Sequence, residues 1–393
     1  MRKTIALMLC LALLASFAAG CTAAPSVSPE AAETPAPTEA PAATEAPAVT
    51  EDPPATEEPA ATPEPTPLET PEPTPLETPE PTPLETPEPE DGLYHFRPKV
   101  CSSYMTELFG EGRTETWFCL VDAVLAGEDT FACPDADTYY WVMGQYPDKC
   151  LPVLKDLIDY CVDRDHPVKD GVASFVYLVP PEEAAARIEG FGVLVEGILN
   201  EALEPDYSDF EKALALYIYF SHHYKYDYEA YHDENNQEYL SSYRVLSLGK
   251  GICQEFSTAY SYMLLQAGVD ADTMSGTRSY DGAAHQWSYV RLQGKSYHID
   301  PTYGIGRPDV LAYFLMDDDQ REAEDRYDRA DFVLCSNYAQ DHPHPDCPAD
   351  DDSFREIWRG SFLELDHENR VLIYSVPNDD GEPTPARFDY SLW

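Results

Sequence analysis

Basic residues are scarce in this chain of 393 residues: 25 lysines and arginines stand against 72 aspartates and glutamates, which gives a formal net charge of -47. Residues 22–91 contain no basic residue and contribute -17 of that charge, the first 21 residues contribute +2, and residues 92–393 therefore carry -32. Nucleic acids and anionic lipid surfaces bind through clusters of basic side chains. The composition argues against a nucleic-acid partner and favours a solvated acidic surface, with cationic partners as the alternative.

Residues 22–91 also have too little apolar surface to form a packed core. They hold 20 of the 36 prolines and 17 acidic residues, a composition typical of disordered chains. The octapeptide TPEPTPLE occupies residues 62–69 and recurs twice more up to residue 85. Proline at this density favours extended polyproline II at about 3.1 Å per residue, so the stretched segment would reach about 200 Å. The sequence predicts a disordered stalk or spacer over residues 21–91 and leaves about 300 residues for the folded part.

The apolar run at the N-terminus is too short to span a bilayer as a mature helix. Two basic residues precede it, it extends over residues 5–17, and small residues then lead to Cys21. This order is typical of a secretion signal. The segment resembles the lipobox of bacterial lipoproteins, except that Ala18 stands where that family usually has Leu. We predict a signal peptide over residues 1–20 and a lipidated Cys21 that anchors the protein at the extracytoplasmic face of the cell membrane; ordinary signal cleavage is the alternative.

Ten cysteines are present, and secretion would permit disulfides. Three of them have other expected places: Cys10 in the signal, Cys21 at the lipobox and Cys253 in the motif described below. The remaining seven are Cys101, Cys119, Cys133, Cys150, Cys161, Cys335 and Cys347. An odd number cannot all pair, and the sequence gives no connectivity. Some of them are therefore expected to pack as free, apolar thiols.

Residues 92–204 mix helix and strand signals, and we predict an α+β region that supports the rest of the fold without chemistry of its own. Residues 153–162 have helical spacing, and residues 173–179 resemble a short strand. A helix is expected to begin at Pro181, where acidic residues fill the first turn.

The core domain is predicted over residues 205–340. It opens with a capping box at Ser208–Glu211, in which the two side chains satisfy the first free amides of a helix. Apolar residues after Cys253 then recur at helical spacing until Gly268 supplies a stop. Cys253 is therefore expected at the start of a buried helix, where the helix dipole stabilises a thiolate and lowers the pKa of the thiol.

Residues 285–292 and 296–300 are predicted to form a hairpin with a two-residue turn. That loop length sets a register in which His285, Trp287 and Asp300 lie on one face of the hairpin. His285 lies diagonal to Asp300, a separation that long side chains close. A register slip of one residue would send Asp300 to the opposite face, so the geometry is specific.

These residue types match the three roles of thiol-based acyl transfer. Cys253 is the candidate nucleophile, His285 the acid and base, and Asp300 the group that orients the imidazole. The backbone amide of Cys253 is the expected oxyanion donor. Tyr226 and Tyr243 are the candidates for a second donor.

The motifs at residues 249–256, 285–287 and 297–302 resemble those of the bacterial transglutaminase-like superfamily: GKGICQEF, HQW and YHIDPT. The resemblance extends over about residues 205–320. It implies an α+β, papain-like fold in which the helix that bears the cysteine packs on an antiparallel sheet that carries the histidine and the aspartate.

The resemblance also implies the site. Cys253, His285 and Asp300 take the catalytic positions, and Trp287 and Gln254 are supporting residues. Glu255 departs from the family, which commonly has Gly there, and we expect its carboxylate to oppose formation of the thiolate.

Residues 341–393 are predicted to form an acidic loop and a C-terminal hairpin. The segment HPHPDC at residues 342–347 contains residue types that bind metal ions, but no second ligand cluster accompanies it, and we predict neither a metal site nor a cofactor. Residues 362–365 and 371–374 are the expected strands of the hairpin, which we expect to close a sheet.

The leading hypothesis is an extracytoplasmic enzyme that transfers acyl groups from peptide or protein amides, with substrates that could be associated with the cell wall. Water as the acceptor makes a cysteine peptidase or amidase, and an amine makes a transglutaminase; the sequence does not choose between them. The alternative is a non-catalytic binding or scaffold lipoprotein that retains the fold. A wall spacer without activity would leave the folded part without a role.

Overall fold

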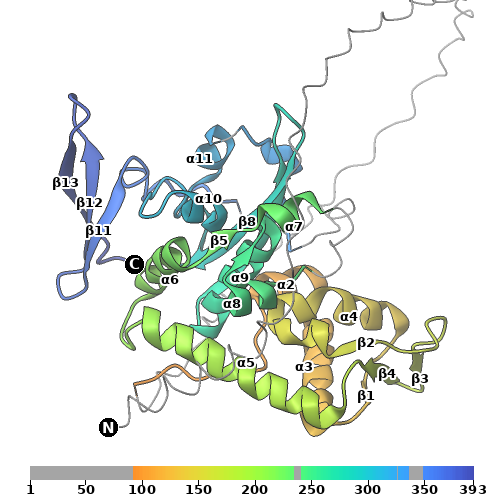
Figure 1. Cartoon of the computed structure of the whole chain (residues 1–393). Coiled ribbons are helices and arrows are strands. Elements are labelled where there is room, and N and C mark those ends of the chain that lie inside the picture. Colours follow the sequence, from red (N-terminus) through yellow and green to blue (C-terminus); the bar gives the residue numbers. More distant parts are fainter. Residues whose placement is uncertain (1–91, 234–239, 325, 336–347) are drawn as a thin grey trace, which may run out of the picture. The chain divides into compact units, whose positions relative to one another are not determined.

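The computed structural model of the chain describes residues 92–233, 240–324, 326–335 and 348–393 (Figure 1). The predicted signal peptide, Cys21, the repeat stalk and the HPHPDC segment lie outside these ranges. All described residues belong to one unit, Pro79–Trp393. Within the described ranges, no helix combines the length and apolar character that a membrane span requires.

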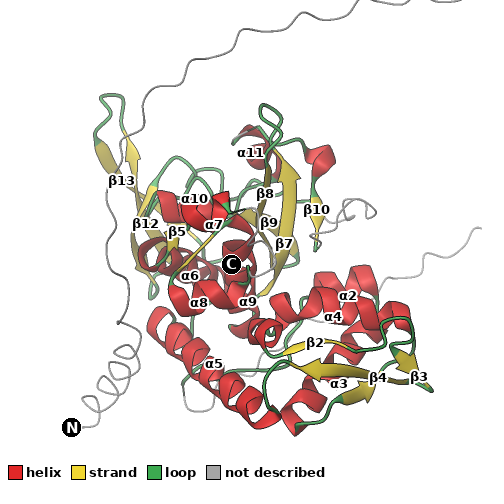
Figure 2. Cartoon of the chain, turned by 45° about the vertical axis from the view of Figure 1, so that its right-hand side comes forward, coloured by secondary structure: helices red, strands yellow, loops and turns green. Residues whose placement is uncertain are grey.

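The N-terminal region combines helices with a small antiparallel sheet (Figure 2). Its helices are α2 (Ser103–Phe109), α3 (Glu111–Ala126), α4 (Ala136–Cys150), the 3-10 helix η2 (Pro152–Asp156) and α5 (Pro181–Ala202). Its strands are β1 (Thr130–Ala132), β2 (Ile158–Tyr160), β3 (Val168–Lys169) and β4 (Val172–Tyr177). The sheet has the order β1-β4-β2, and β3 also pairs with β4. The helix predicted from Pro181 and the strand predicted over 173–179 are both confirmed.

The helix predicted over residues 153–162 is wrong. The segment forms η2 and then β2, which pairs with β4. Val153, Leu154 and Leu157, whose spacing suggested a helix, are buried in and just after the 3-10 turn, and Ile158 is buried in the strand. Pairing with a distant strand satisfies the same apolar pattern, and such tertiary contacts override local spacing.

The core domain begins with α6 (Asp209–His223), and its capping box is formed by Ser208 and Glu211 as predicted. The other helices of the domain are α7 (Tyr228–His232), α8 (Ser242–Leu248), α9 (Cys253–Gln266), α10 (Pro301–Gly306), α11 (Asp318–Ala323) and the 3-10 helix η4 (Arg329–Asp331). The strands are β5 (Lys225–Tyr226), β6 (Lys250–Gly251), β7 (Asp270–Thr277), β8 (Ala284–Leu292), β9 (Lys295–Ile299) and β10 (Val333–Leu334). Strands β10, β7, β8 and β9 form an antiparallel sheet in that order, and α9 packs against β7 and β8.

The register of the β8–β9 hairpin is the predicted one. Leu292 pairs with Lys295 across a two-residue turn, and Ser288 pairs with Ile299. Gln293 and Gly294 both have positive φ, of 50° and 74°, as a tight hairpin turn of this length requires. The ladder ends at the pair of Ser288 and Ile299, and Asp300 follows β9 directly with its side chain 2.7 Å from His285, so the turn brings the two predicted residues together.

The C-terminal region contains a separate antiparallel sheet of β11 (Ser361–Asp366), β12 (Val371–Pro377) and β13 (Pro383–Asp389). The predicted hairpin corresponds to β11 and β12 and is confirmed, and it completes a three-stranded sheet with β13, a strand that the sequence did not indicate. β13 pairs with β12 over the full length from Val371 to Pro377. Two prolines in β13 obscured this strand in the sequence, although an edge strand tolerates residues without an amide hydrogen.

The cysteines within the described residues are free thiols. They are Cys101, Cys119, Cys133, Cys150, Cys161, Cys253 and Cys335. Most of them are buried, as expected of thiols that pack as apolar side chains.

Candidate active site

Cys253 is the first residue of α9 and is half-buried. Two glycines shape the approach to it. Gly249 ends α8 in the left-handed conformation with φ of 73°. At Gly251 a Cβ atom would lie 2.6 Å from the Val245 side chain and 3.1 Å from a Glu255 oxygen, so only glycine fits there. The chain thus turns tightly and sets the thiol at the positive end of a buried helix.

Asp300 lies directly after β9 and uses its two oxygens differently. Oδ1 caps α10 and accepts hydrogen bonds from the amides of Thr302 and Tyr303, at 3.1 and 3.3 Å. Oδ2 lies 2.7 Å from Nε2 of His285, which extends from β8. Asp300 is fully buried, and the His285 side chain is 10% exposed. The cap therefore fixes the carboxylate that holds the imidazole.

The thiol of Cys253 and the imidazole of His285 interact electrostatically, and each shifts the pKa of the other. Because Nε2 of His285 is engaged by Asp300, Nδ1 is the ring nitrogen left for the thiol. Burial alone would raise the pKa of the thiol, but the charge of His285 and hydrogen bonds from His285 and the Gln286 amide lower it below the ordinary value. Burial lowers the pKa of His285, and the charges of Asp300 and Cys253 outweigh it and raise that pKa to about 9. The pair is thus poised as thiolate and imidazolium.

Arg321 on α11 is a site residue that the sequence did not indicate. Its Nη1 lies 3.0 Å from Oδ2 of Asp300, and both side chains are fully buried. The guanidinium lies over the rings of Trp287, at 4.8 Å, and Tyr327, at 4.3 Å. Burial raises the pKa of Asp300, but His285 and then Arg321 more than offset it and hold the pKa below its usual value. Arg321 therefore helps to keep the carboxylate ionised.

Aromatic rings surround the imidazole of His285. The ring of Tyr303 lies 5.1 Å away between centroids, that of Tyr327 5.9 Å and that of Trp287 6.0 Å. These rings restrict the orientation of the imidazole and exclude water from it, which strengthens its interactions with Asp300 and Cys253.

Trp287 has a supporting position. Its Nε1 donates to Nδ1 of His298 at 2.8 Å, and Nε2 of His298 lies 2.8 Å from Oδ1 of Asp318. An indole donates one hydrogen bond in its ring plane, so the indole hydrogen of Trp287 is committed to this buried chain. The chain fixes Trp287, whose ring in turn contacts both His285 and Arg321.

The expectation that Glu255 opposes the thiolate is not supported by its surroundings. Arg244 donates to both oxygens of the Glu255 carboxylate, at 2.8 and 2.9 Å, and the amides of Ser241 and Ile252 also donate to it. Arg244 in addition contacts Asp227 at 2.9 Å. The bidentate ion pair with Arg244 balances the buried charge of Glu255, so this charge does not act on the Cys253 thiol. The sequence did not indicate this ion pair, because Arg244 and Glu255 are eleven residues apart in the chain.

The remaining predicted residues lie at different distances from the trio. Tyr226 lies on β5, and burial and then the charge of Cys253 raise its pKa. Tyr243 is on α8 and packs its ring against Phe191 at 5.6 Å, in the core beneath α5, which argues against a role as an oxyanion donor. Gln254 follows Cys253, and its carbonyl accepts from the side chain of Gln286 at 3.3 Å.

Metal-ligating side chains do not gather in this region. Over the part of the chain that the structure describes, no group of three His, Cys, Asp or Glu side chains is arranged to hold a metal ion.

A thiol at a helix start that faces a carboxylate-bound histidine on an antiparallel sheet defines the class of transglutaminase-like and papain-like proteins. Residues 197–301 match the model of the transglutaminase-like superfamily, and the chain therefore carries a transglutaminase-like domain.

Two curated relatives are similar to this chain in the same part. Kyphoscoliosis peptidase of Mus musculus is 30% identical over 131 residues, and that of Homo sapiens is 28% identical over 132 residues. Each match covers 31% of this chain and 19% of the relative, so the chain spans about a fifth of the length of these proteins.

Two solved structures also resemble the chain locally. A crystal structure described as a TGase shows 26% identity with a TM-score of 0.27, and covers 32% of this chain and 34% of the other. LapG of Legionella pneumophila shows 14% identity with a TM-score of 0.22, and covers 30% of this chain and 62% of the other. The fold assignment rests on the family match and on the observed helix and sheet.

Proposed function

We propose that the protein is an extracytoplasmic thiol enzyme that transfers acyl groups from peptide or protein amides, with Cys253, His285 and Asp300 as its catalytic residues. The observation that carries the proposal is the buried pair of His285 Nε2 and Asp300 Oδ2, 2.7 Å apart, whose imidazole interacts electrostatically with the Cys253 thiol at the start of α9. The superfamily match and the peptidase names of the relatives support the same class of chemistry.

The geometry supports a two-step reaction. The Cys253 thiolate attacks the amide carbonyl carbon, the C–S bond forms, and the electron pair moves onto the oxygen, where the Cys253 amide donates to it. The C–N bond then breaks as His285 gives its proton to the departing amine, which leaves a thioester. His285 next takes a proton from water or from a second amine, which attacks the thioester and releases the thiolate.

Asp300 and its partners keep the imidazole in place through both steps. The carboxylate stabilises the imidazolium and fixes which ring nitrogen meets the thiol. The ion pair with Arg321 and the α10 cap hold the carboxylate in turn. This preorganisation removes the need to orient the acid when the thioester forms.

The choice of acceptor is tested by comparing wild type with Cys253→Ala on cell-wall peptides and on casein, with and without a primary amine. Released fragments indicate hydrolysis, and incorporated amine indicates transfer. Either product should vanish in Cys253→Ala. Product formation that persists in the variant, or no product from any of these substrates, would contradict the proposal and favour a binding or scaffold protein.

The state of the thiol is tested separately by alkylation with iodoacetamide at a series of pH values, read at individual cysteines by peptide mass spectrometry. Cys253 should react well below the ordinary thiol pKa of about 8.5, and His285→Ala should remove this early reactivity. Cys133 is the internal control, because burial raises the pKa of its thiol to about 11. Reaction of Cys253 only near the ordinary pKa would favour the scaffold alternative.

The proposed location rests on the N-terminal sequence, which suits a signal peptide and a lipidated Cys21. We expect the protein in the membrane fraction, accessible to protease added outside intact cells. Cys21→Ala should release it into the soluble fraction. A cytoplasmic wild-type protein would contradict this part of the proposal without affecting the chemistry.

A further inference from the structure

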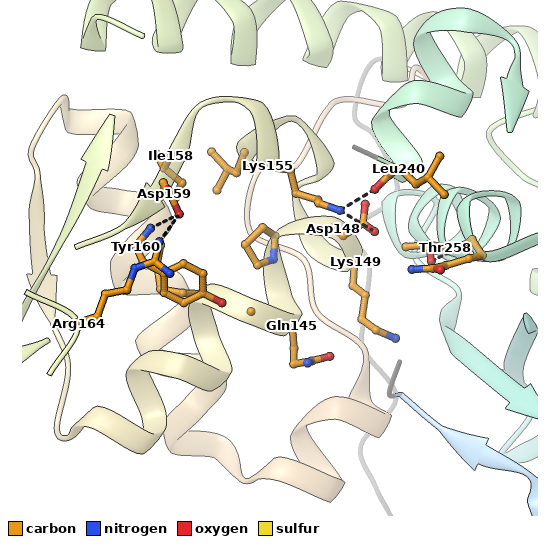
Figure 3. Close-up of a pocket in the computed structure, with 15 residues that line it drawn as sticks. Gln145, Asp148, Lys149, Lys155, Ile158, Asp159, Tyr160, Arg164, Leu240 and Thr258 are labelled. Atoms are coloured by element: carbon orange, nitrogen blue, oxygen red, sulfur yellow. Dashed lines mark hydrogen bonds and ion pairs between the residues drawn. The ribbon is translucent and has the colours of Figure 1, made fainter. Parts of the chain in front are cut away.

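A cleft of about 630 Å³ separates the N-terminal region from the start of α9 (Figure 3). One wall is formed by α4, η2, β2 and Arg164, and the other by Leu240, Gln254 and Thr258. Its volume lies in the range typical of ligand sites. Most of its residues precede residue 197, where the superfamily match begins. The cleft is therefore a feature of the part of the chain that the sequence assigned only a supporting role.

The cleft borders the first two turns of α9, the helix that begins at Cys253. Gln254, which lines it, is the neighbour of Cys253 in α9. Gln286 links β8 to this part of α9: its side chain donates to the Gln254 carbonyl at 3.3 Å and to Thr258 Oγ1 at 3.2 Å. A chain bound in the cleft would thus lie beside the first turn of α9, which begins at Cys253.

The wall from the N-terminal region offers the edge of a strand. β2 ends its sheet in the order β1-β4-β2, and all three of its residues line the cleft. Because neighbouring strand residues point to opposite faces, a cleft that meets three in a row runs along the edge of the strand. The Tyr160 amide donates to the Asp159 side chain at 2.7 Å. Such an edge suits an extended peptide.

Two accessible cations line the same cleft. Lys155 Nζ donates to the Leu240 carbonyl at 2.7 Å and lies 3.8 Å from the nearest Asp148 oxygen, so its other hydrogens can serve a ligand. Arg164 is 62% exposed, lies over the Tyr160 ring and is 3.6 Å from Asp159. Figure 3 shows these cations in different parts of the cleft, Arg164 beside Asp159 and Tyr160 and Lys155 beside Asp148 and Leu240.

The charge of the cleft differs from that of the rest of the fold. Three basic and two acidic side chains line it, whereas residues 92–393 contain 23 basic and 55 acidic residues. Lys149, the third basic residue, is buried and paired with Asp272, so the accessible positive charge comes from Lys155 and Arg164. The acidic surface of the rest of the fold repels an acidic peptide, and this repulsion is weaker at the cleft.

We propose that this cleft binds the substrate as an extended peptide segment on one side of the reacting amide, and that Lys155 and Arg164 select acidic side chains in it. The proposal rests on the function proposed above and names the substrate class for that site. It makes the N-terminal region part of the substrate site.

The test uses the full-length protein and a synthetic library of randomised peptides, with modified products identified by mass spectrometry. Wild type should enrich Asp and Glu on one side of the modified amide. Lys155→Gln should lower the acidic preference by about fivefold, and the double variant with Arg164→Gln should abolish it. Lys99→Gln is the matched control, because Lys99 is also exposed and paired, with Asp122 at 2.9 Å, but lies outside the cleft.

A binding measurement separates this inference from the proposed activity. Cys253→Ala is titrated with two fluorescent peptide pools that differ only in Asp and Glu against Asn and Gln. Tighter binding of the acidic pool, lost in the Lys155→Gln background but retained in the Lys99→Gln background, supports the inference even where wild type turns over no substrate. Equal binding of both pools, or turnover without acidic preference, overturns it and leaves the catalytic proposal standing.

Discussion

Two histidines of the core sheet each pair with a carboxylate, and the geometries of the two pairs are nearly the same. His285 meets Asp300 at 2.7 Å, and His298 meets Asp318 at 2.8 Å, each through Nε2. The difference lies at the second ring nitrogen. In His298 it accepts a hydrogen bond from Trp287, whereas in His285 it is left for the Cys253 thiol, whose charge raises the pKa of His285.

This difference decides what each ring can do. An indole nitrogen only donates, so Nδ1 of His298 carries no proton and the ring is held as a neutral tautomer. Taking up a proton there would break the bond to Trp287. His285 has a partner that can give and accept a proton, and its side chain is slightly exposed, whereas His298 is fully buried. One pair is suited to chemistry and the other to holding the indole beside it.

The largest effect is expected from removing either end of the proposed catalytic chain. Cys253→Ala and His285→Ala should each lower kcat by about 10⁴-fold or more, since neither the nucleophile nor its acid works alone. The double variant should lose no more than the single variants, because the two groups act as a unit. Steady-state rates on whichever of the tested peptides or casein gives product provide the measurement. Additive losses in the double variant would mean that the two residues act independently.

The pairs are compared directly by the same substitution in each. His298→Gln should lower the free energy of unfolding by about 1–3 kcal/mol, because a glutamine cannot satisfy Trp287 and Asp318 together. His285→Gln should cost less stability, since Arg321 and two backbone amides still satisfy Asp300. Urea unfolding and alkylation of Cys253 are measured on both. Alkylation of Cys253 below the ordinary thiol pKa should be retained in His298→Gln and lost in His285→Gln. The opposite pattern would mean that His298, and not His285, activates the thiol.

Each carboxylate also has an arginine, and the burial of the two arginines differs. Arg321 is fully buried against Asp300, whereas Arg329 is 39% exposed and 3.7 Å from Asp318. We expect Arg321→Met to lower kcat by about 10- to 100-fold, because the carboxylate loses a group that positions it. Arg329→Met is the matched control and should leave kcat unchanged.

The pH profile tests whether the role of Arg321 is electrostatic. Activity needs the imidazolium, so it should fall as pH rises through about 9, the pKa to which its neighbours raise His285. Removal of the nearby positive charge strengthens the hold of His285 on its proton, and the alkaline limb should move to higher pH in Arg321→Met. A lower rate with an unmoved limb would indicate a packing role only.

The local parts of this site could be predicted from the sequence. The two-residue turn at Gln293-Gly294 fixes the register of β8 and β9, and with it the common face of His285 and Asp300. The helix at Cys253 follows from its apolar spacing and the glycines before it. Each of these features depends on residues close together in the chain, where periodicity and turn chemistry carry the information.

The missed parts depend on distant contacts. Arg321 reaches Asp300 from a short helix rich in acidic residues, and nothing in its local sequence indicates burial. Arg244 balances Glu255 from a different helix. The segment 153–162 becomes a turn and an edge strand only because β4 is available to pair with it. Its role in the cleft likewise depends on α9, about 100 residues further along the chain.

The smallest effect is expected at a third histidine–carboxylate pair, which is more exposed than the other two. Nδ1 of His367 lies 2.7 Å from Glu211, and Nε2 lies 3.2 Å from Asp206. The hydrogen bond to Glu211 raises the pKa of His367 above its ordinary value, and burial opposes this only in part. A raised folded-state pKa means that the stabilisation is complete below about pH 6.5, the ordinary value, and is lost as pH rises through the folded pKa.

His367→Gln should therefore lower the free energy of unfolding by less than about 1 kcal/mol at pH 5.5 and by almost nothing at pH 9. Urea unfolding at the two pH values measures the difference. His222→Gln is the control, because His222 is exposed, lies on the same helix as Glu211 and is paired with Asp309. An equal loss at both pH values would assign the effect to packing on the Tyr207 ring, 5.5 Å away. Only the charge of His367 can make its contribution to stability depend on pH in this range. Without that dependence, the three histidine–carboxylate pairs would differ only in their burial and in their partners.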